Sequence, residues 1–149
     1  MSETTTPKTS QKISMESARA AIVSMFEAFE LPLQIEDEKT LEKKDDPFIS
    51  SLAKYVERER LEITGEGDDI KIIQHLRRDL HGSKKLEWNW SRLGMGKARV
   101  RIGSDGVVPF GQAYTVAAPM VGFEAGEIQT LHPVDLSALE DIAGFFQKI

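Results

Sequence analysis

The sequence contains no cysteine among its 149 residues. Disulfide bonds, thiolate nucleophiles and cysteine-ligated zinc or iron–sulfur centres are therefore excluded. Long hydrophobic runs are also missing, because no window approaches the roughly 18 apolar residues that a membrane-spanning helix requires. The segment Met1–Gln11 is polar and has no apolar stretch of the kind found in signal peptides. Together these absences predict a protein of the cytoplasm that does not cross a membrane.

Histidine is scarce as well, with His75, His81 and His132 as the three examples. A zinc site without cysteine would need three or four other ligands brought together. His75 and Asp79 are four residues apart, but such a pair on a surface helix is more often simply solvated. We therefore predict no metal site.

Complete catalytic and cofactor-binding motifs are also lacking. No serine stands in a Gly-x-Ser-x-Gly elbow. The segment 94–97, Gly-Met-Gly-Lys, resembles the end of a phosphate-binding loop, but Ser91 and Ala98 replace the glycine and the hydroxyl residue that the full motif requires. We predict neither a cofactor nor catalytic residues, and the pattern favours a non-enzymatic protein. An enzyme of an unrecognised family stays open, and it would require a pocket in which two polar groups converge, for example His75 with an acidic partner.

What is present is an ordinary globular composition, 40% hydrophobic and 29% charged. The length fits one domain. We predict a disordered polar tail at 1–12, because its residues offer nothing to bury, and a single domain at 13–149. Within that domain the segment 33–46 contains six acids and three lysines, and it is predicted to be a charged connector without a packed element.

The spacing of apolar residues predicts helices in the first half of the chain. One begins at Met15, with Ser14 as its N-cap, and ends before Pro32. A second follows Pro47. A third is predicted for 69–80 from a stripe of four apolar residues, Ile70, Ile73, Leu76 and Leu80.

Strict alternation of apolar and polar residues then predicts strands. Leu86–Ser91 and Ala98–Ile102 are expected to form a hairpin around the glycine-rich turn 93–96, and one or two further strands are expected within 107–116. An amphipathic helix returns after Pro133. N-terminal helices, a small antiparallel β-meander of three to four strands and a C-terminal amphipathic helix together predict the α+β class.

Charge is strongly segregated along the chain. The formal net charge is −5, yet residues 77–101 carry eight basic and two acidic side chains. This stretch is therefore at about +6 and the remainder at about −11, which creates a local field that the net charge conceals. The candidate surface for an anionic partner comprises Lys84, Lys85, Arg92, Lys97, Arg99 and Arg101.

Two tryptophans lie in the same basic stretch, and their orientation separates two interpretations. If Trp88 and Trp90 face solvent on the arginine side, the sheet becomes a stacking platform for single-stranded nucleic acid. If they point inward with Leu86, they belong to the core, which is more usual for two aligned tryptophans. We favour burial. The cationic face then remains available to nucleic acid, to an acidic protein surface or to an acidic region of a neighbouring copy.

The C-terminal segment carries a run of spaced residues from Gly122 to Phe146, with Leu-His-Pro-Val-Asp-Leu at 131–136 near its centre. This run of about 25 residues resembles the closing segment of phage Mu-type tail assembly proteins, which are small cytoplasmic chaperone-like proteins. The resemblance implies a non-enzymatic role in binding tail components during virion assembly, in the cytoplasm of the host. It assigns no role to individual residues.

Three functional interpretations follow. The first is an interaction or assembly protein that binds protein partners and is expected to self-associate. The second is a nucleic-acid-binding protein that uses the cations of the predicted hairpin, at 84–101, and the third is the unrecognised enzyme. Under the first, the two amphipathic helices are candidate partner-binding elements, although both helices could instead complete the core. Their candidate contact residues are Met15, Ile22, Phe26, Phe29, Leu139 and Phe146.

Overall fold

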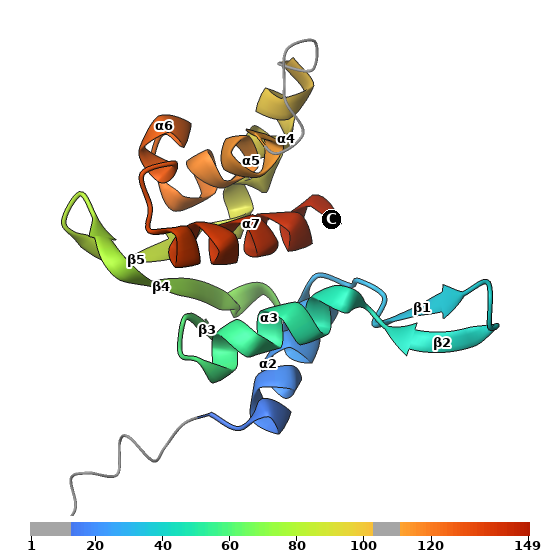
Figure 1. Cartoon of the computed structure of the whole chain (residues 1–149). Coiled ribbons are helices and arrows are strands. Elements are labelled where there is room, and N and C mark those ends of the chain that lie inside the picture. The colour runs from blue at the N-terminus through green and yellow to red at the C-terminus, as the bar shows by residue number, and fades with distance from the viewer. Residues whose placement is uncertain (1–12, 103–110) are drawn as a thin grey trace, which may run out of the picture.

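The computed structural model describes residues 13–102 and 111–149, and for residues 99–102, 111 and 112 it describes the backbone alone. Helices accompany two small antiparallel sheets, and a long helix closes the chain, which confirms the predicted α+β class (Figure 1). The predicted tail at 1–12 lies outside the described residues. None of the described helices is long and apolar enough to cross a membrane. In chain order the elements are α2 (Met15–Ala28), β1 (Gln34–Asp37), β2 (Glu42–Asp45), α3 (Pro47–Glu57), β3 (Leu61–Thr64), η2 (Gly67–Asp69), β4 (Lys71–Leu80), β5 (Ser83–Trp88), η3 (Trp90–Arg92), α4 (Leu93–Ile102), α5 (Gly111–Val121), α6 (Ala125–Ile128) and α7 (Pro133–Gln147).

The first two predicted helices are confirmed, together with the residues that start them. Helix α2 begins where the Ser14 hydroxyl accepts the Ser17 N–H at 3.1 Å. Helix α3 begins where Asp46 Oδ1 accepts the Phe48 N–H at 2.9 Å, with Pro47 at the first helical position. The inward face of α2 consists of Ala18, Ile22, Met25 and Phe26.

The central strand β4 stands where a third helix was predicted, so that prediction is wrong. Its inward positions follow a two-residue period, with Ile72, Gln74 and Leu76 buried. The polar Gln74 interrupts the apolar alternation, and the remaining apolar residues happen to match helical spacing. Burial of Gln74 is tolerated because its Nε2 donates to the Asp135 carbonyl oxygen at 2.8 Å and its Oε1 accepts from Trp88 Nε1 at 3.3 Å.

The three-stranded sheet has the order β3-β4-β5, and both neighbouring pairs are antiparallel. Leu80 pairs with Ser83 across a two-residue turn, His81-Gly82, in which both residues have positive φ values of 49° and 82°. Such a pair of left-handed residues is typical of the type I′ hairpin turn, whose twist matches that of the strands. A three-stranded meander is therefore present, although it uses largely different residues from those predicted.

The predicted hairpin of 86–91 with 98–102 does not form. Strand β5 pairs with β4 instead, and residues 93–102 form helix α4, which packs on α5. Gly96 explains this close packing, because a Cβ atom there would lie 2.5 Å from the Val116 carbonyl oxygen. The glycine-rich segment is thus a helix–helix contact rather than a turn. The further strands expected within 107–116 are replaced by α5 from residue 111 onward, and 107–110 lie outside the described residues.

The predicted charged connector folds into a two-stranded ribbon of β1 and β2. Its register runs from Gln34 opposite Asp45 to Asp37 opposite Glu42. Every residue of both strands is exposed except the half-buried Asp37. Lys44 Nζ lies 3.0 Å from Asp37 Oδ2, and this contact lowers the pKa of the Asp37 carboxyl. The ribbon therefore adds nothing to the core, and Figure 1 shows it projecting on the side of the molecule opposite the β4–β5 turn.

Helix α7 connects the layers of the fold, since it contacts α3, α5 and β4 (Figure 1). The rings of Phe145 and Phe26 lie 5.1 Å apart, and Phe29 meets both Phe145 and Phe146 edge to face. Trp88 stacks on Phe146 at 5.7 Å with an interplanar angle of 16°. These aromatic contacts join α2, α7 and β5, and the predicted amphipathic C-terminal helix is confirmed.

Candidate functional site

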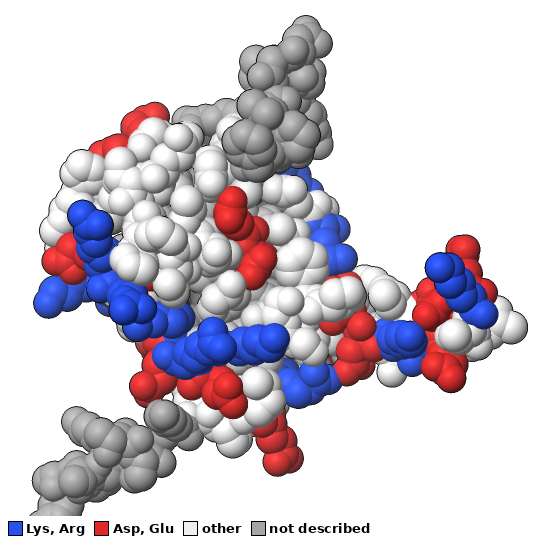
Figure 2. All heavy atoms as spheres, viewed as in Figure 1, with Lys and Arg blue, Asp and Glu red and all other residues white. Residues whose placement is uncertain are grey.

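The turn end of the β4–β5 hairpin carries four exposed cations. Arg77 and Arg78 precede the turn, and Lys84 and Lys85 follow it. We call residues 77–85 the basic hairpin. Figure 2 shows lysine and arginine atoms gathered at the left of the view, where Figure 1 places this end of the two strands. The cations therefore lie together on a projecting part of the surface.

Few carboxylates oppose these cations. Within the described part of the chain, Arg77, Arg78 and Lys84 take part in no ion pair, and Lys85 Nζ comes no closer than 3.8 Å to Glu87 Oε1. Exposed charges that lack a partner set up a field that attracts anions and orients them before contact. The basic hairpin is accordingly suited to an anionic ligand.

A buried carboxylate binds the backbone of the basic hairpin on the side that faces helix α7. Asp135 of α7 is 1% exposed. Its Oδ1 and Oδ2 both accept the Arg77 N–H at 2.9 Å, and its Oδ2 accepts the Arg78 N–H at 3.2 Å. These bonds occupy the interruption of the β4–β5 register between His75 and Leu80. Sequence reasoning missed Asp135, whose one signal was an acidic residue in the first turn of a helix that starts with proline.

The other predicted cations lie on different elements. Arg92 is exposed in η3, and Lys97 is half-buried on α4. Arg99 and Arg101 were predicted to lie on the strand Ala98–Ile102, where residues two apart share a face, but both belong to helix α4, where residues two apart are rotated by about 200°. That prediction is wrong, and the side chains of these two arginines lie outside the described atoms.

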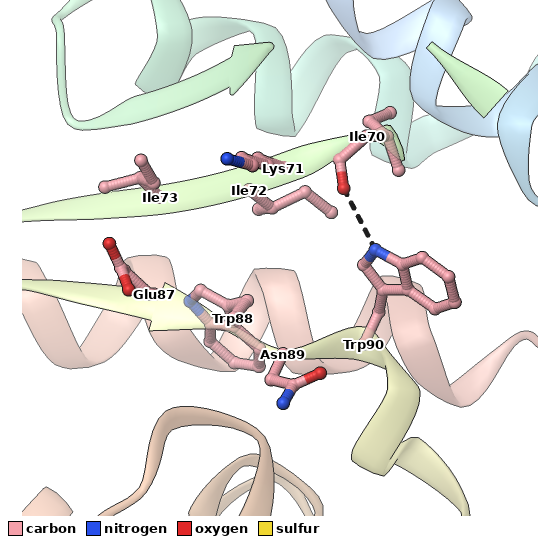
Figure 3. A pocket seen from close by; sticks show the side chains of 8 residues that line it. All are labelled: Ile70, Lys71, Ile72, Ile73, Glu87, Trp88, Asn89 and Trp90. Atoms are coloured by element: carbon pink, nitrogen blue, oxygen red, sulfur yellow. Dashed lines mark hydrogen bonds between the residues drawn. The ribbon is translucent and has the colours of Figure 1, made fainter. Parts of the chain in front are cut away.

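The two tryptophans do not form a stacking platform. Trp88 is 3% exposed, so its predicted burial is confirmed. Trp90 is half-buried, and its Nε1 donates to the Ile70 carbonyl oxygen at 3.0 Å (Figure 3). A hollow of about 310 Å³ beside them is bordered by Lys71 and Glu87 among its polar residues. Both indoles pack within the body of the protein, so neither is free to stack on the bases of a nucleic acid.

Strand β5 is an edge strand, and its unpaired side borders a groove of about 420 Å³. Backbone N–H and C=O groups point alternately to the two sides of an antiparallel strand. Asn89 N donates away from the sheet to the Met120 carbonyl oxygen at 2.8 Å, so Glu87 and Lys85 also direct their backbone groups outward. The Lys85 carbonyl oxygen accepts from Ser83 Oγ at 2.8 Å, and it keeps a second lone pair. In β4, His75 lies opposite Lys85, and its N–H donates to the Arg60 carbonyl oxygen, next to β3, at 2.8 Å. The backbone of His75 therefore points away from β5, as expected if Lys85 points away from β4. The groove residues beyond the strand are Arg92, Met120, Val121, Gly122 and Phe123.

One convergent polar pair borders a second groove of about 480 Å³. His75 Nε2 and Glu62 Oε1 lie 2.8 Å apart, and their side chains are 40% and 48% exposed. The pair meets the geometric requirement for an acid and a base, but both groups are solvated, whereas catalytic pairs are usually tuned by burial. No three histidine, aspartate or glutamate residues of the described chain are placed to hold a metal ion.

Most candidate partner-binding residues of the two helices lie in the core. Ile22, Phe26, Leu139 and Phe146 are each 0% exposed, so they are not accessible to a partner. Phe29 packs against the same core, and Met15 is 36% exposed. For these helices the structure therefore favours the simpler interpretation, in which they complete the fold. The prediction that these four residues contact a partner is corrected accordingly, because their side chains are buried in the single copy.

Comparisons with known proteins give no functional assignment. No protein-family model matches the chain, and neither curated proteins nor solved structures give a significant match. Function is therefore inferred from the geometry of the described residues.

Proposed function

We propose that this chain is a non-enzymatic interaction protein that binds an anionic protein surface through the basic hairpin. The observation that carries the proposal is the group of four exposed cations, unpaired or weakly paired among the described residues, on a hairpin that Asp135 fixes from behind. Because the backbone is already fixed, less conformational entropy is lost when a complex forms. Binding through these cations is expected to be fast and sensitive to salt.

A protein partner fits the site better than nucleic acid does. The buried Trp88 and the half-buried Trp90 are not free to stack on bases. Nucleic acid remains the alternative, since any cationic surface attracts phosphates.

An assembly role is the setting that we favour for this binding. The C-terminal run that resembles phage Mu-type tail assembly proteins forms α6 and α7. Both elements support the basic hairpin, because Asp135 binds its backbone and Glu127 Oε2 lies 3.1 Å from His81 Nε2 at its turn. Participation in phage morphogenesis in the host cytoplasm is part of the proposal, which rests here on the resemblance alone.

Two fluorescent anionic probes separate these alternatives: a polyglutamate peptide and a single-stranded DNA of mixed sequence. We expect polyglutamate to bind at low salt, with affinity that falls as salt rises and that drops about tenfold in the double variant Lys84→Ala/Lys85→Ala. The matched control is Lys54→Ala/Arg58→Ala, which removes two exposed cations from α3. Absence of polyglutamate binding at low salt, or an equal loss in the control, would contradict the proposal. Tighter binding of DNA that is lost in the same hairpin variant would favour nucleic acid instead.

A further inference from the structure

The ribbon has a free strand edge. As at the edge of β5, alternate backbone groups there point away from the neighbouring strand. Asp46 N donates to the Leu33 carbonyl oxygen at 3.1 Å, just before the first pair of the ribbon. Alternation therefore turns the N–H and C=O groups of Gln34 and Glu36 away from β2. Unpaired edges of this kind form a template for pairing with another strand.

The two edges carry opposite charges. Strand β1 and its turn contain Glu36, Asp37 and Glu38, whereas β5 begins with Lys84 and Lys85. The Glu36, Glu38 and Lys84 side chains take part in no ion pair within the described ranges. Opposite charges on facing strands stabilise a pair, and like charges destabilise it.

We infer that β1 of one copy of this chain adds to the free edge of β5 of a second copy as an antiparallel strand. This inference rests on the proposed function, because it names the anionic partner of the basic hairpin. Several antiparallel registers match the outward backbone groups of both edges. Among them, the register with Glu36 opposite Lys85 and Gln34 opposite Glu87 places opposite charges across from each other. A parallel strand that met the same groups would place Glu36 against Glu87, so charge selects the antiparallel arrangement.

The remaining pairs of this register also fit. Asp37, which Lys44 already contacts at 3.0 Å within the ribbon, lies opposite Lys84 and would be shared between the two cations. Ile35 lies opposite Leu86, and directly opposite side chains share a face of the sheet. Because Leu86 faces the helices, Ile35 points to the side where the groove is lined by Met120. Burial there would cover a side chain that is 42% exposed in the single copy.

The pairing has to join two molecules. Figure 1 shows the ribbon and the turn end of β4–β5 on opposite sides of the body, so a chain does not reach its own β5 edge. The four residues of β1 fit within the six of β5. Each copy then offers one ribbon and one edge, and such head-to-tail contacts build rings or filaments.

Sedimentation velocity of the full-length chain over a range of concentrations tests the charge pairs. We expect the wild type to form oligomers, the single variants Glu36→Lys and Lys85→Glu to shift toward monomer, and the chain with both reversals to associate again. Glu66→Lys, an exposed acid of the loop before η2, is the control and is expected to leave association unchanged. A wild type that stays monomeric up to about 1 mM would overturn the inference, as would a double variant that associates no better than the single ones.

Disulfide crosslinking tests the register, and the absence of native cysteine leaves no background. In the register above, residues 37 and 84 form a non-hydrogen-bonded pair with Cα atoms about 4.5 Å apart, within the range of a disulfide. We expect a mixture of the Asp37→Cys and Lys84→Cys proteins to form a crosslinked dimer on oxidation, seen on a non-reducing gel. The matched mixture of Glu66→Cys with Lys84→Cys is expected to give none. Failure of the first mixture, or equal crosslinking in both, would overturn the register.

A backbone variant separates strand addition from attraction between charges. Glu87→Pro removes an N–H that points out of the sheet, which an edge strand tolerates. We expect it to abolish self-association while polyglutamate still binds the basic hairpin. Association that survives Glu87→Pro would rule out strand addition. A monomeric wild type that binds polyglutamate would end this inference and leave the proposed function standing, whereas loss of polyglutamate binding would remove the proposed function itself.

Discussion

The two antiparallel sheets of this protein depend on different interactions. The sheet β3-β4-β5 buries one face against the helices, and its inward side chains, such as Ile72 and Leu86, are 1% exposed. The ribbon β1–β2 buries no residue, and its pairing is supported by cross-strand contacts such as that of Lys44 with Asp37. An isolated two-stranded ribbon is at best marginally stable in water. Folding therefore constrains the first sheet at nearly every inward position. In the ribbon, Asp37 and Asp45 take part in ion pairs, whereas Glu36 takes part in none within the described residues.

Leu41 at the end of the ribbon makes the contrast sharper. Its side chain is 84% exposed, and its φ is +60°. An exposed leucine gains nothing from burial, and a left-handed conformation disfavours any residue with a large side chain. Folding of the single copy gives no reason for leucine at this position.

The largest effect is expected where α7 supports the three-stranded sheet. Asp135→Ala would leave the partly buried N–H groups of Arg77 and Arg78 without their acceptor. We expect a loss of about 2–4 kcal/mol in the free energy of unfolding, measured by urea denaturation. Asp68→Ala, at an exposed acid of η2, is the control and should change stability by less than about 0.5 kcal/mol. Similar losses in both variants would contradict a special role for Asp135.

A smaller effect is expected at the contact of α4 with α5. Gly96→Ala places a Cβ atom against the Val116 carbonyl oxygen, and the strain should reduce the free energy of unfolding by about 1–3 kcal/mol. Gly94→Ala, two residues earlier in the same helix, meets open space and should raise it by up to about 1 kcal/mol, because alanine favours helix. The same denaturation experiment measures both variants. Equal and small changes would show that the helices are not in close contact at Gly96.

The body of the protein, unlike the ribbon strands, contains a tyrosine whose ionisation is expected to lower stability at alkaline pH. Burial, followed by the 2.7 Å hydrogen bond to Asp141, raises the pKa of Tyr55 well above its ordinary value. The folded state therefore favours the neutral phenol, so its stabilising effect is complete below about pH 10 and is lost as pH rises toward the raised pKa. We expect the free energy of unfolding to fall above about pH 10, and to fall less steeply in Tyr55→Phe. An unchanged pH dependence in this variant would assign the fall to other groups.

The smallest effect is expected in the ribbon. Leu41→Asn replaces an exposed apolar side chain by one that adopts the left-handed conformation more readily. We expect the free energy of unfolding to stay the same or to rise by up to about 1 kcal/mol. A loss of more than about 1 kcal/mol would show that Leu41 packs within the single copy, and the contrast between the two sheets would then fail.

Sequence patterns predicted an element correctly where the apolar residues followed a single spacing, either helical or alternating. The N-cap Ser14 and the proline Pro47 marked helix starts, and the alternation around Leu86 and Trp88 marked β5. Patterns failed where a polar side chain occupies an inward position, as Gln74 does, because its partners come from distant parts of the chain. They failed again at 98–102, where an alternating segment is helical and lies in the helix that Gly96 brings against α5. Two residues of the candidate site, Lys84 and Lys85, were predicted, whereas the support from Asp135 depends on a contact that no local pattern encodes.

The bond between Asp135 and the Arg77 N–H joins residues 58 positions apart. A ribosome adds roughly 5–20 residues per second, so the carboxylate is synthesised about 3–12 s after the strand that it holds. During that interval both strands of the ribbon have already been synthesised, whereas the basic hairpin lacks its support from Asp135. We therefore expect a nascent chain to expose the acidic strand β1 before the hairpin that carries the β5 edge is fixed. Pairing between neighbouring nascent chains would then be delayed until helix α7 has emerged.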